Sequence, residues 1–288
     1  MAIANKRRLS LRRQLTDWAA TLAAGTAALL VLAPLVAVFG YLVYRGIGAL
    51  DLAFLTNTPK PVGENGGGMA NAIVGSGLIL AIGSAIGVPL GIATGVYLSE
   101  YGKHRFGDVV RFTSDLLNGV PSIVIGIVVY SLIVLQQKHF SAFSGGVALG
   151  IMMIPTIARS TEEMLLMVPQ NVREAALALG VPQWRTTLSI TLRTATSGII
   201  TGVMLAFARV AGETAPLLFT AFGNQFWNLK PNQPTAALPL QIFVYANSPY
   251  DEWHRQAWAG ALVLIVLIVG TVSVVRLIAR RGTLQGAN

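Results

Sequence analysis

Two charged residues of opposite sign lie within an apolar stretch of the chain, and together they could bind or guide an ion. Arg209 and Glu213 are four positions apart in the segment 196–222, which is long and apolar enough to cross a membrane. An arginine at the centre of a membrane helix costs about 2.5–3.5 kcal/mol on insertion, so such a residue usually faces a cavity or a partner. The i, i+4 spacing predicts that both side chains share one helix face and can pair.

A third cation completes the set of residues that could handle an anion. Arg159 follows shortly after Pro155, and we expect it at the cytoplasmic mouth of a short span, 145–158. One interpretation is a cationic pathway for an anion, in which Glu213 holds Arg209 in place or gates it. The alternative is structural: the charged pair only ties helices together, and Arg159 only extends its guanidinium to the membrane surface.

The elements that position these residues are those of an all-α integral membrane protein. The chain has 288 residues, of which 53% are hydrophobic and only 11% charged, whereas soluble domains carry roughly a quarter charged residues. It has no cysteine, which excludes disulfides and thiolate metal sites. The net charge of +9 could suggest nucleic acid, but basic and aromatic residues do not interleave as in nucleic-acid-binding proteins. We therefore interpret the charge as membrane orientation and expect no nucleic-acid partner.

Six segments are apolar enough to span a bilayer. The first is too long for a signal peptide, whose apolar region is about 7–15 residues, and we expect Pro121 to kink the third. In the second, glycines recur every four residues at 83, 87, 91 and 95, which predicts a bare face for close packing of another helix. The expected spans are 18–44, 71–99, 112–135, 145–158, 196–222 and 258–277.

The basic residues predict how these spans are oriented. Six spans put both termini on one side, where fifteen Lys and Arg residues fall, against five on the other side. Because cytoplasmic loops carry the excess of Lys and Arg, we expect both termini in the cytoplasm. The same rule places there a polar segment that interrupts the apolar chain after Arg159. Within it, Gly180 predicts a helix stop and Pro182 the first turn of a new helix.

Signatures of catalysis are missing from the sequence. The histidines His104, His139 and His254 fall in predicted loops on two different sides, and there is no HExxH motif. There is also no GxxxxGK[ST] phosphate-binding loop, because Gly102-Lys103 is followed by a histidine. We therefore expect no catalytic residue, no metal and no cofactor, and the chain is predicted not to be an enzyme.

The polar segment carries a recognisable motif. Glu174, Ala175 and Ala176, followed by Gly180 and then by Ile190 and Leu192, resemble the EAA signature of ABC transporter permease subunits; Arg193 stands where the family usually has Pro. The resemblance implies a six-helix type I importer permease fold. It also implies that a cytoplasmic loop, 160–195, docks onto a separate ATP-hydrolysing subunit. The chain is then divided into three parts: residues 1–70 with the cytoplasmic N-terminus, the first span and the outer loop, the permease core 71–278, and the cytoplasmic tail 279–288.

Two further segments narrow the resemblance. Residues 154–165 and 208–220 are similar to the phosphate-transport permeases, more closely to their A-type than to their C-type subunits. This implies an inner-membrane subunit for phosphate import that works with a C-type permease, two ATP-binding subunits and an external phosphate-binding protein. The resemblance implies that Arg159 and Arg209 match arginines of that family's substrate pathway, with Glu213 as the adjacent acid in the predicted pathway. A permease for sulfate, molybdate or an organic solute, and a secondary transporter, are the alternatives.

Overall fold

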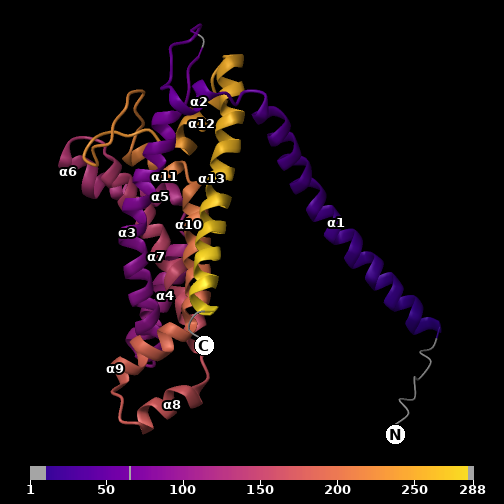
Figure 1. The fold of residues 1–288 in the computed structure, drawn as a ribbon, viewed down its shortest axis with the longest axis vertical. Helices are drawn as coiled ribbons and strands as arrows, with labels where there is room; N and C mark the ends of the chain where they lie inside the picture. Colours follow the sequence, from indigo (N-terminus) through magenta and orange to yellow (C-terminus); the bar gives the residue numbers. More distant parts are fainter. Residues whose placement is uncertain (1–10, 65, 285–288) are drawn as a thin grey trace.

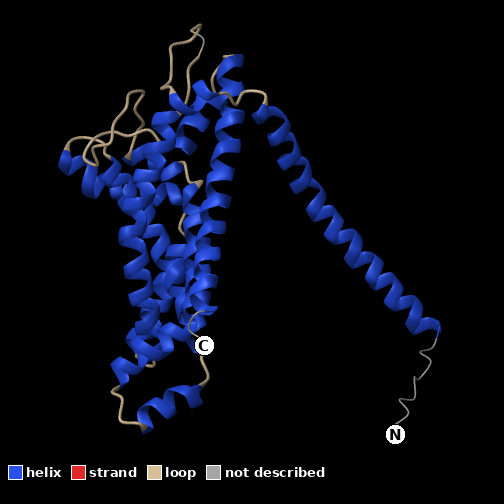
Figure 2. Ribbon diagram, viewed as in Figure 1, coloured by secondary structure: helices blue, strands red, loops and turns tan. Residues whose placement is uncertain are grey.

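The computed structural model describes residues 11–64 and 66–284, and their regular structure is helical apart from one isolated bridge between Phe222 and Thr235 (Figure 2). The long helices are α1 (Leu11–Ile47), α3 (Ala70–Glu100), α4 (Arg105–Gly119), α7 (Ala142–Leu166), α10 (Leu192–Ala211) and α13 (Asp251–Leu284). The shorter ones are α2 (Leu52–Thr56), α5 (Ser122–Val129), α6 (Leu135–Gln137), α8 (Gln170–Ala178), α9 (Gln183–Thr186), α11 (Ala215–Thr220) and α12 (Leu238–Ala246). Two π-helical turns, η1 (Tyr130–Val134) and η2 (Thr187–Thr191), adjoin α6 and α10.

Within the described residues, five helical segments are long and apolar enough to cross a membrane, and a bent pair of helices makes up to six. The pair is α4 with the α5–η1–α6 segment, which meet at 103°. The expected third span is therefore broken and not merely kinked. Val120 and Pro121 both leave the helical region, with ψ of 130° and 134°, because proline lacks a backbone N–H and disfavours helical geometry in the residue before it.

The predicted glycine face of α3 is confirmed, and its partner is α7 of the same chain. A Cβ added at Gly87 would lie 2.8 Å from the Met153 Cβ, and one added at Gly91 would lie 2.7 Å from the Ile157 Cβ. The contact points advance along both helices in the same direction, so α3 and α7 are parallel. Their interface forms the centre of the main hydrophobic core, to which α5, α10 and α11 also contribute.

The parallel pairing of α3 and α7 determines the topology. Two successive parallel helices require the chain between them to return across the bundle, so the broken pair α4–α6 acts as the return. With this pair counted as one span, the described residues hold up to six crossings, the number predicted. The start of α1 and the end of α13 lie at the end of the bundle that carries α8 and α9, here called the α8 end; α2 and α12 lie at the opposite end, the α12 end (Figure 1).

The expected fourth and fifth spans have the wrong bounds. The fourth, predicted over 145–158, is the 25-residue helix α7, and the polar residues after Ala158 continue it for two turns. The fifth, predicted over 196–222, is one helical run from Gln183 to Ala211, formed by α9, η2 and α10. Both errors have one cause: polarity indicates where a helix leaves the hydrocarbon, whereas a helix ends only where its backbone conformation changes.

Helix α1 diverges from the rest of the bundle (Figure 1). It packs on α13 near its C-terminal end, where the rings of Tyr41 and Trp258 meet edge to face at 5.3 Å and Gly46 contacts Leu262. None of its most apolar window is buried. An apolar helix exposed in this way requires lipid or another protein around it.

Candidate substrate pathway and coupling site

Arg209 and Glu213 do not share a helix face. Helix α10 ends at Ala211 with Gly212 as its C-cap, and Glu213 lies in the short break before α11, whose first turn holds Pro216. The structure records no ion pair between the two side chains, both of which are described. The predicted i, i+4 pair is therefore wrong, because α10 ends at Ala211, between its two members.

Arg209 lies exposed on the surface of the isolated chain, in the last turn of α10. Leu205 and Thr201, one and two turns earlier, are exposed on the same side of the helix. Within the described residues, no hydrogen bond or ion pair of the Arg209 side chain is recorded, and Glu213 is half-buried without one. A guanidinium inside a membrane-spanning segment needs water, an anion or a partner subunit beside it.

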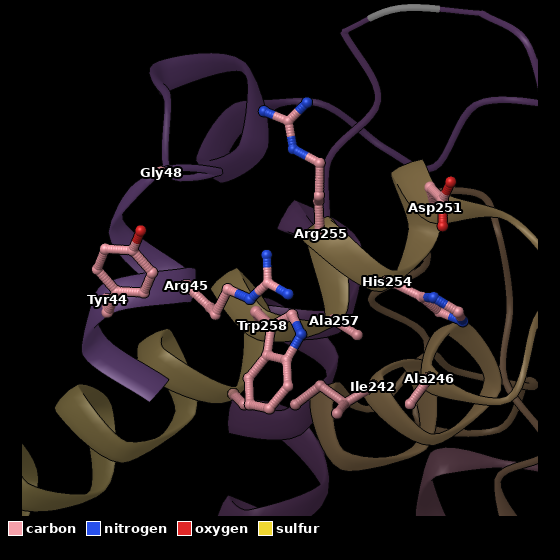
Figure 3. Close-up of a pocket in the computed structure, with 11 residues that line it drawn as sticks. Tyr44, Arg45, Gly48, Ile242, Ala246, Asp251, His254, Arg255, Ala257 and Trp258 are labelled. Carbon is pink, nitrogen blue, oxygen red and sulfur yellow. The ribbon is translucent and has the colours of Figure 1, made fainter. Parts of the chain in front are cut away.

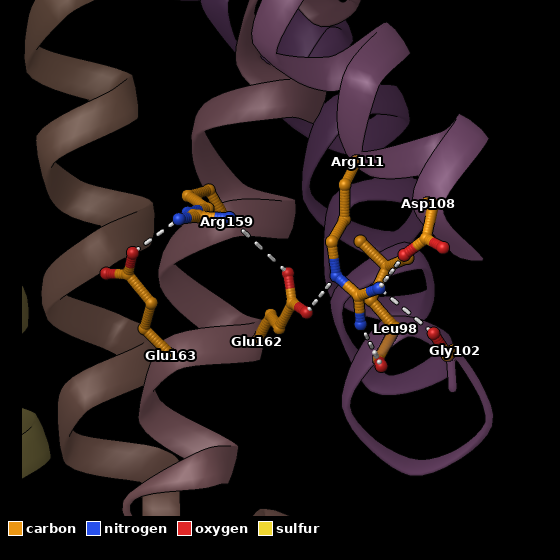
Figure 4. Close-up of polar contacts among 7 residues, drawn as sticks. All are labelled: Leu98, Gly102, Asp108, Arg111, Arg159, Glu162 and Glu163. Carbon is orange, nitrogen blue, oxygen red and sulfur yellow. Dashed lines mark hydrogen bonds and ion pairs between the residues drawn. The ribbon is translucent and has the colours of Figure 1, made fainter. Parts of the chain in front are cut away.

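Arg159 lies inside α7, seven residues before the helix ends, and not at the end of a helix as expected. Its side chain is half exposed and is bracketed by two acids of the same helix (Figure 4): Nε donates to Glu163 Oε1 at 2.9 Å, and an Nη1 lies 4.0 Å from Glu162 Oε2. The Arg159 guanidinium therefore has local counter-charges, which Arg209 does not have.

Glu162 belongs to a charge network that the sequence did not indicate. Its carboxylate is 5% exposed and accepts a hydrogen bond from Arg111 Nε on α4 at 2.7 Å. Arg111 also donates to the carbonyls of Leu98 and Gly102, where α3 ends (Figure 4). The network joins α3, α4 and α7 beside Arg159. The i, i+3 spacing from Arg159 to Glu162 could have pointed to part of this network, but Arg111 lies just outside the expected span 112–135.

The contacts between α7 and α10 place Arg159 and Arg209 relative to each other. Gly202 of α10 packs on Ser160 of α7, and Gly198 packs on Met164, so the helices are antiparallel. Continuing this pairing puts Arg209 level with residue 153, six positions before Arg159. At ~1.5 Å per residue, the two arginines are separated by roughly 9 Å along the bundle axis, with Arg159 nearer the α8 end.

The expected coupling segment forms two short helices beyond the end of the bundle (Figure 1). Helix α8 carries Glu174, Ala175 and Ala176; Glu174 is exposed and accepts from the Gln170 amide at 3.0 Å, Ala175 is exposed, and Ala176 is buried. Gly180 ends α8 with φ of +78°, while its N–H bonds the Leu177 carbonyl and the next N–H bonds the Ala176 carbonyl. This is a Schellman motif, so the predicted glycine stop is confirmed.

The segment is held to the bundle by ionic contacts and continues directly into α10. Arg173 of α8 bonds the Glu100 carboxylate at the end of α3 and the Leu165 carbonyl at the end of α7. Pro182 is the N-cap of α9 and not a first-turn residue as expected. Arg193 lies in the first turn of α10, and the backbone is helical through it. The second short helix therefore continues into α10 without an end at Arg193.

The α8 end exposes several large apolar side chains, which indicates a contact with another protein. Leu179 is 84% exposed and Trp184 is 61% exposed. Clustered exposed apolar residues on a polar segment commonly mark a protein interaction site. Others at this end are Leu166, Met167, Leu177 and Leu188.

Neither the histidines nor the acids of the described residues make a metal site. No group of three or more His, Asp or Glu side chains is close enough to hold an ion within residues 11–64 and 66–284. The Nε2 of His254 lies 2.6 Å from the Ser248 carbonyl, and the Nδ1 of His139 lies 3.2 Å from the Phe140 carbonyl.

Comparison with known proteins gives consistent matches. Residues 87–283 match the family described as binding-protein-dependent transport system inner membrane component. The chain is 48% identical over 228 residues to the phosphate transport system permease protein PstA of Yersinia pestis, covering 79% of this chain and 77% of the relative. It is 46% identical over 261 residues to the PstA protein of Xylella fastidiosa, covering 90% of each. Among solved structures, a chain of the inward-facing MetNI methionine ABC transporter aligns with a TM-score of 0.54 at 18% identity, over 74% of this chain and 94% of that one.

Proposed function

The chain belongs to the family of binding-protein-dependent transport system inner membrane components, and on this premise we propose that it is a permease subunit of an ATP-driven phosphate importer. It is a multi-pass protein of the bacterial inner membrane, and it is a permease subunit and not an enzyme. The fold agrees with that of a type I ABC importer permease. The function of its relatives supports phosphate as the substrate.

The observation that carries the pathway proposal is the uncovered Arg209. Its guanidinium lies on an exposed face of a membrane-spanning helix without a recorded carboxylate partner among the described residues. Such a residue is stable in a membrane only if a second subunit or water covers it. We assign this face to the pathway formed with a second permease, of the C type, in which Arg209 meets the phosphate anion.

Arg159 would receive the anion next, about two helical turns closer to the α8 end. There the anion competes with Glu162 and Glu163 for the guanidinium. Such competition keeps binding weak, and weak binding is what a pathway needs if it is to release its substrate. Glu213, half-buried beside the break after α10, lies four residues from Arg209 and would repel an anion that strays from the arginine.

The coupling segment would convert ATP hydrolysis in separate subunits into movement of the bundle. We assign 160–195 to docking with one of two ATP-binding subunits, with Glu174, Ala175, Ala176 and Gly180 shaping the docked helix. The bond from Arg173 to Glu100 would carry its displacement into α3. The core is 71–278, preceded by the first helix and outer loop in 1–70 and followed by the tail 279–288.

This assignment places the α8 end in the cytoplasm and the α12 end outside. An extracytoplasmic phosphate-binding protein would then dock at the α12 end. The loop between α11 and α12 offers apolar contacts for it, since Phe226 is 76% exposed and Trp227 and Leu229 are more than half exposed. Phosphate released there would enter near Arg209, and closure of the ATP-binding subunits would alternate access between the two ends.

The test is the charge-removing substitution Arg209→Gln. In cells that lack other phosphate routes, we expect uptake of labelled phosphate to fall about 10- to 100-fold, the effect of removing a hydrogen bond to a charged group. Arg276→Gln, which removes an exposed arginine from α13, is the matched control and should leave uptake unchanged. Assembly is checked by co-purification of the ATP-binding subunit with each variant. Normal phosphate uptake by Arg209→Gln would refute the pathway, and wild-type uptake of sulfate in place of phosphate would refute the substrate.

A further inference from the structure

The buried carboxylate of Glu162 has one oxygen without a partner. Its Oε1 accepts a hydrogen bond from Arg111, whereas Oε2 is buried and has no hydrogen-bond partner among the described residues. A cation lies close to this oxygen: Nη1 of Arg159 is 4.0 Å away, beyond the range of about 2.7–3.2 Å for a hydrogen bond. Buried polar atoms are nearly always paired, so an unpaired one requires a structural or functional reason.

Arg159 is held away from this oxygen by a weaker interaction. Its Nε donates to Glu163 Oε1 at 2.9 Å, and both of these side chains are about half exposed. Exposed ion pairs contribute little to stability, whereas a hydrogen bond from a cation to a buried carboxylate is stronger. A shift of roughly 1 Å between the guanidinium and Glu162 would close the gap to hydrogen-bond distance. Figure 4 shows Arg159 between its two alternative partners.

Arg111 ties Glu162 to the end of α3. Its Nη2 donates to the Leu98 carbonyl and its Nη1 to the Gly102 carbonyl, each at 3.0 Å, while its Nε bonds Glu162 at 2.7 Å. Because a guanidinium is planar and rigid, these donors move as one body. A displacement of the α3 end would therefore move the Glu162 carboxylate and change its distance from Arg159.

The same end of α3 is bound to the coupling segment. Glu100 accepts a hydrogen bond from Arg173 of α8, and it lies two residues after Leu98, whose carbonyl holds Arg111. The side chains of Glu100 and Arg173 are both largely buried, so their attraction is little screened by water and salt. A continuous contact series thus runs from Arg173 through Glu100, the end of α3 and Arg111 to Glu162.

We propose that Arg111 and Glu162 are positioning residues that couple the segment 160–195 to Arg159. The inference rests on the proposed function, which assigns this segment to docking and Arg159 to the substrate pathway. In this structure Arg159 is turned to Glu163 and is open to an anion. When a docked ATP-binding subunit displaces α8, the contact series moves Glu162 onto the guanidinium. The buried carboxylate then replaces the anion as the partner of Arg159, and the anion is released.

The test measures labelled phosphate transported per ATP hydrolysed by the assembled transporter in proteoliposomes. Glu162→Gln keeps the size of the side chain and removes its charge, and we expect the ratio to fall about 10-fold while ATP hydrolysis is retained. Arg111→Lys keeps the charge but cannot bond the two carbonyls and the carboxylate together, so it should lower the ratio in the same way.

Two control substitutions remove charges outside the contact series. Asp108 is 77% exposed and bonds the same Arg111 guanidinium at 3.2 Å, so Asp108→Asn is the matched control for loss of an ion pair of Arg111. Arg255 is exposed and lines a cavity of about 880 Å³ at the opposite, α12 end of the bundle (Figure 3). Both Asp108→Asn and Arg255→Gln should leave the transport ratio unchanged.

A double substitution and a direct distance measurement distinguish coupling from a purely structural role. Arg173→Gln breaks the contact series at its other end. If both sites act through one series, Arg173→Gln/Glu162→Gln should lower the ratio no further than the more severe single substitution, whereas losses from distant independent sites multiply. Electron cryomicroscopy of the wild type, without and with a non-hydrolysable ATP analogue, should show Arg159 and Glu162 at about 2.7–3.2 Å in one of the two states.

Four results would overturn the proposal. An unchanged transport ratio in Glu162→Gln, or ATP hydrolysis that falls in step with uptake, would reduce the network to a structural brace. Multiplied losses in the double variant would show that its two sites act independently. A gap that stays at 4.0 Å or more in both states would exclude the closure. The proposed function is tested separately, because phosphate uptake by the wild type and its loss in Arg209→Gln do not depend on this series.

Discussion

The interface between α3 and α7 allows a stability prediction to be worked from the structure. At Gly95, an added Cβ would lie 2.5 Å from the Thr161 Cβ and 2.6 Å from the Ala158 carbonyl oxygen. Both neighbours are fully buried, and neither is the free end of a flexible side chain. Ordinary contacts of a Cβ are 3.4–4 Å, so Gly95→Ala requires the helices to separate by about an ångström or to distort locally.

The magnitude follows from two opposing terms. Overpacking of a close-packed core costs about 1–3 kcal/mol, whereas replacing glycine by alanine within a helix favours the helix by about 0.8–1.0 kcal/mol. Gly77 of the same helix provides the matched control, because a Cβ added there has no atom within 4 Å. Gly77→Ala should therefore be neutral or stabilising, and Gly95→Ala should be destabilising by up to about 2 kcal/mol after the helix term is subtracted.

The assay is thermal unfolding of the purified transporter in one detergent, with wild type and both variants measured at the same heating rate. We expect a lower unfolding midpoint for Gly95→Ala and an unchanged or higher one for Gly77→Ala. Equal midpoints for the two variants would refute the reasoning, since only the distances at the interface distinguish the sites.

Two further pairs of substitutions test the other structural conclusions. Glu162→Gln removes the carboxylate beside Arg111 and should destabilise the protein by about 1.5–3 kcal/mol. Its control is Glu163→Gln, which should cost only about 0–1 kcal/mol because the pair of Glu163 with Arg159 is half exposed. Equal unfolding midpoints for the two variants would contradict the buried network. Gly180→Ala places an L side chain at φ of +78° in open space and should cost about 1–2 kcal/mol of local backbone strain, measured as weaker co-purification of the ATP-binding subunit. Gly180→Asn should have a milder effect because asparagine tolerates this conformation. Unchanged co-purification with the alanine variant would show that docking does not depend on this turn.

Much of the architecture could be predicted because it depends on local properties of the chain. Hydropathy identified the six crossings, since a backbone in lipid must be helical over the full thickness of the bilayer. The glycines at 83, 87, 91 and 95 predicted a packing face, because a four-residue repeat lies on one side of a helix. Gly180 predicted a helix stop from its tolerance of positive φ. The motif from Glu174 to Leu192 indicated the permease family, whose membership the comparisons support.

The errors arose where one residue type has several structural outcomes. Pro121 was expected to bend a helix and instead breaks it at 103°, whereas Pro155 lies within a continuous helix. The polar residues that follow Pro155 were expected to end the span, yet they are good enough helix formers to extend it. Arg209 and Glu213 were expected to pair, but the helix ends between them at Gly212. In each case the residues next along the chain, and not the one residue alone, decide where the helix bends, continues or ends.

The sequence by itself determined the class of protein, the apolar segments that could cross a membrane, and the side of the polar segment 160–195 relative to the termini. These depend on composition, periodicity and spacing, which are properties of short segments. The tertiary structure alone decided which charges meet: Arg111 reaches Glu162 across 51 positions of chain, Arg173 reaches Glu100, and Arg209 is left uncovered. It also decided that α1 diverges from the rest of the bundle. The physical reason is that an ion pair depends on the distance between two helices, and that distance is determined by packing over the whole bundle.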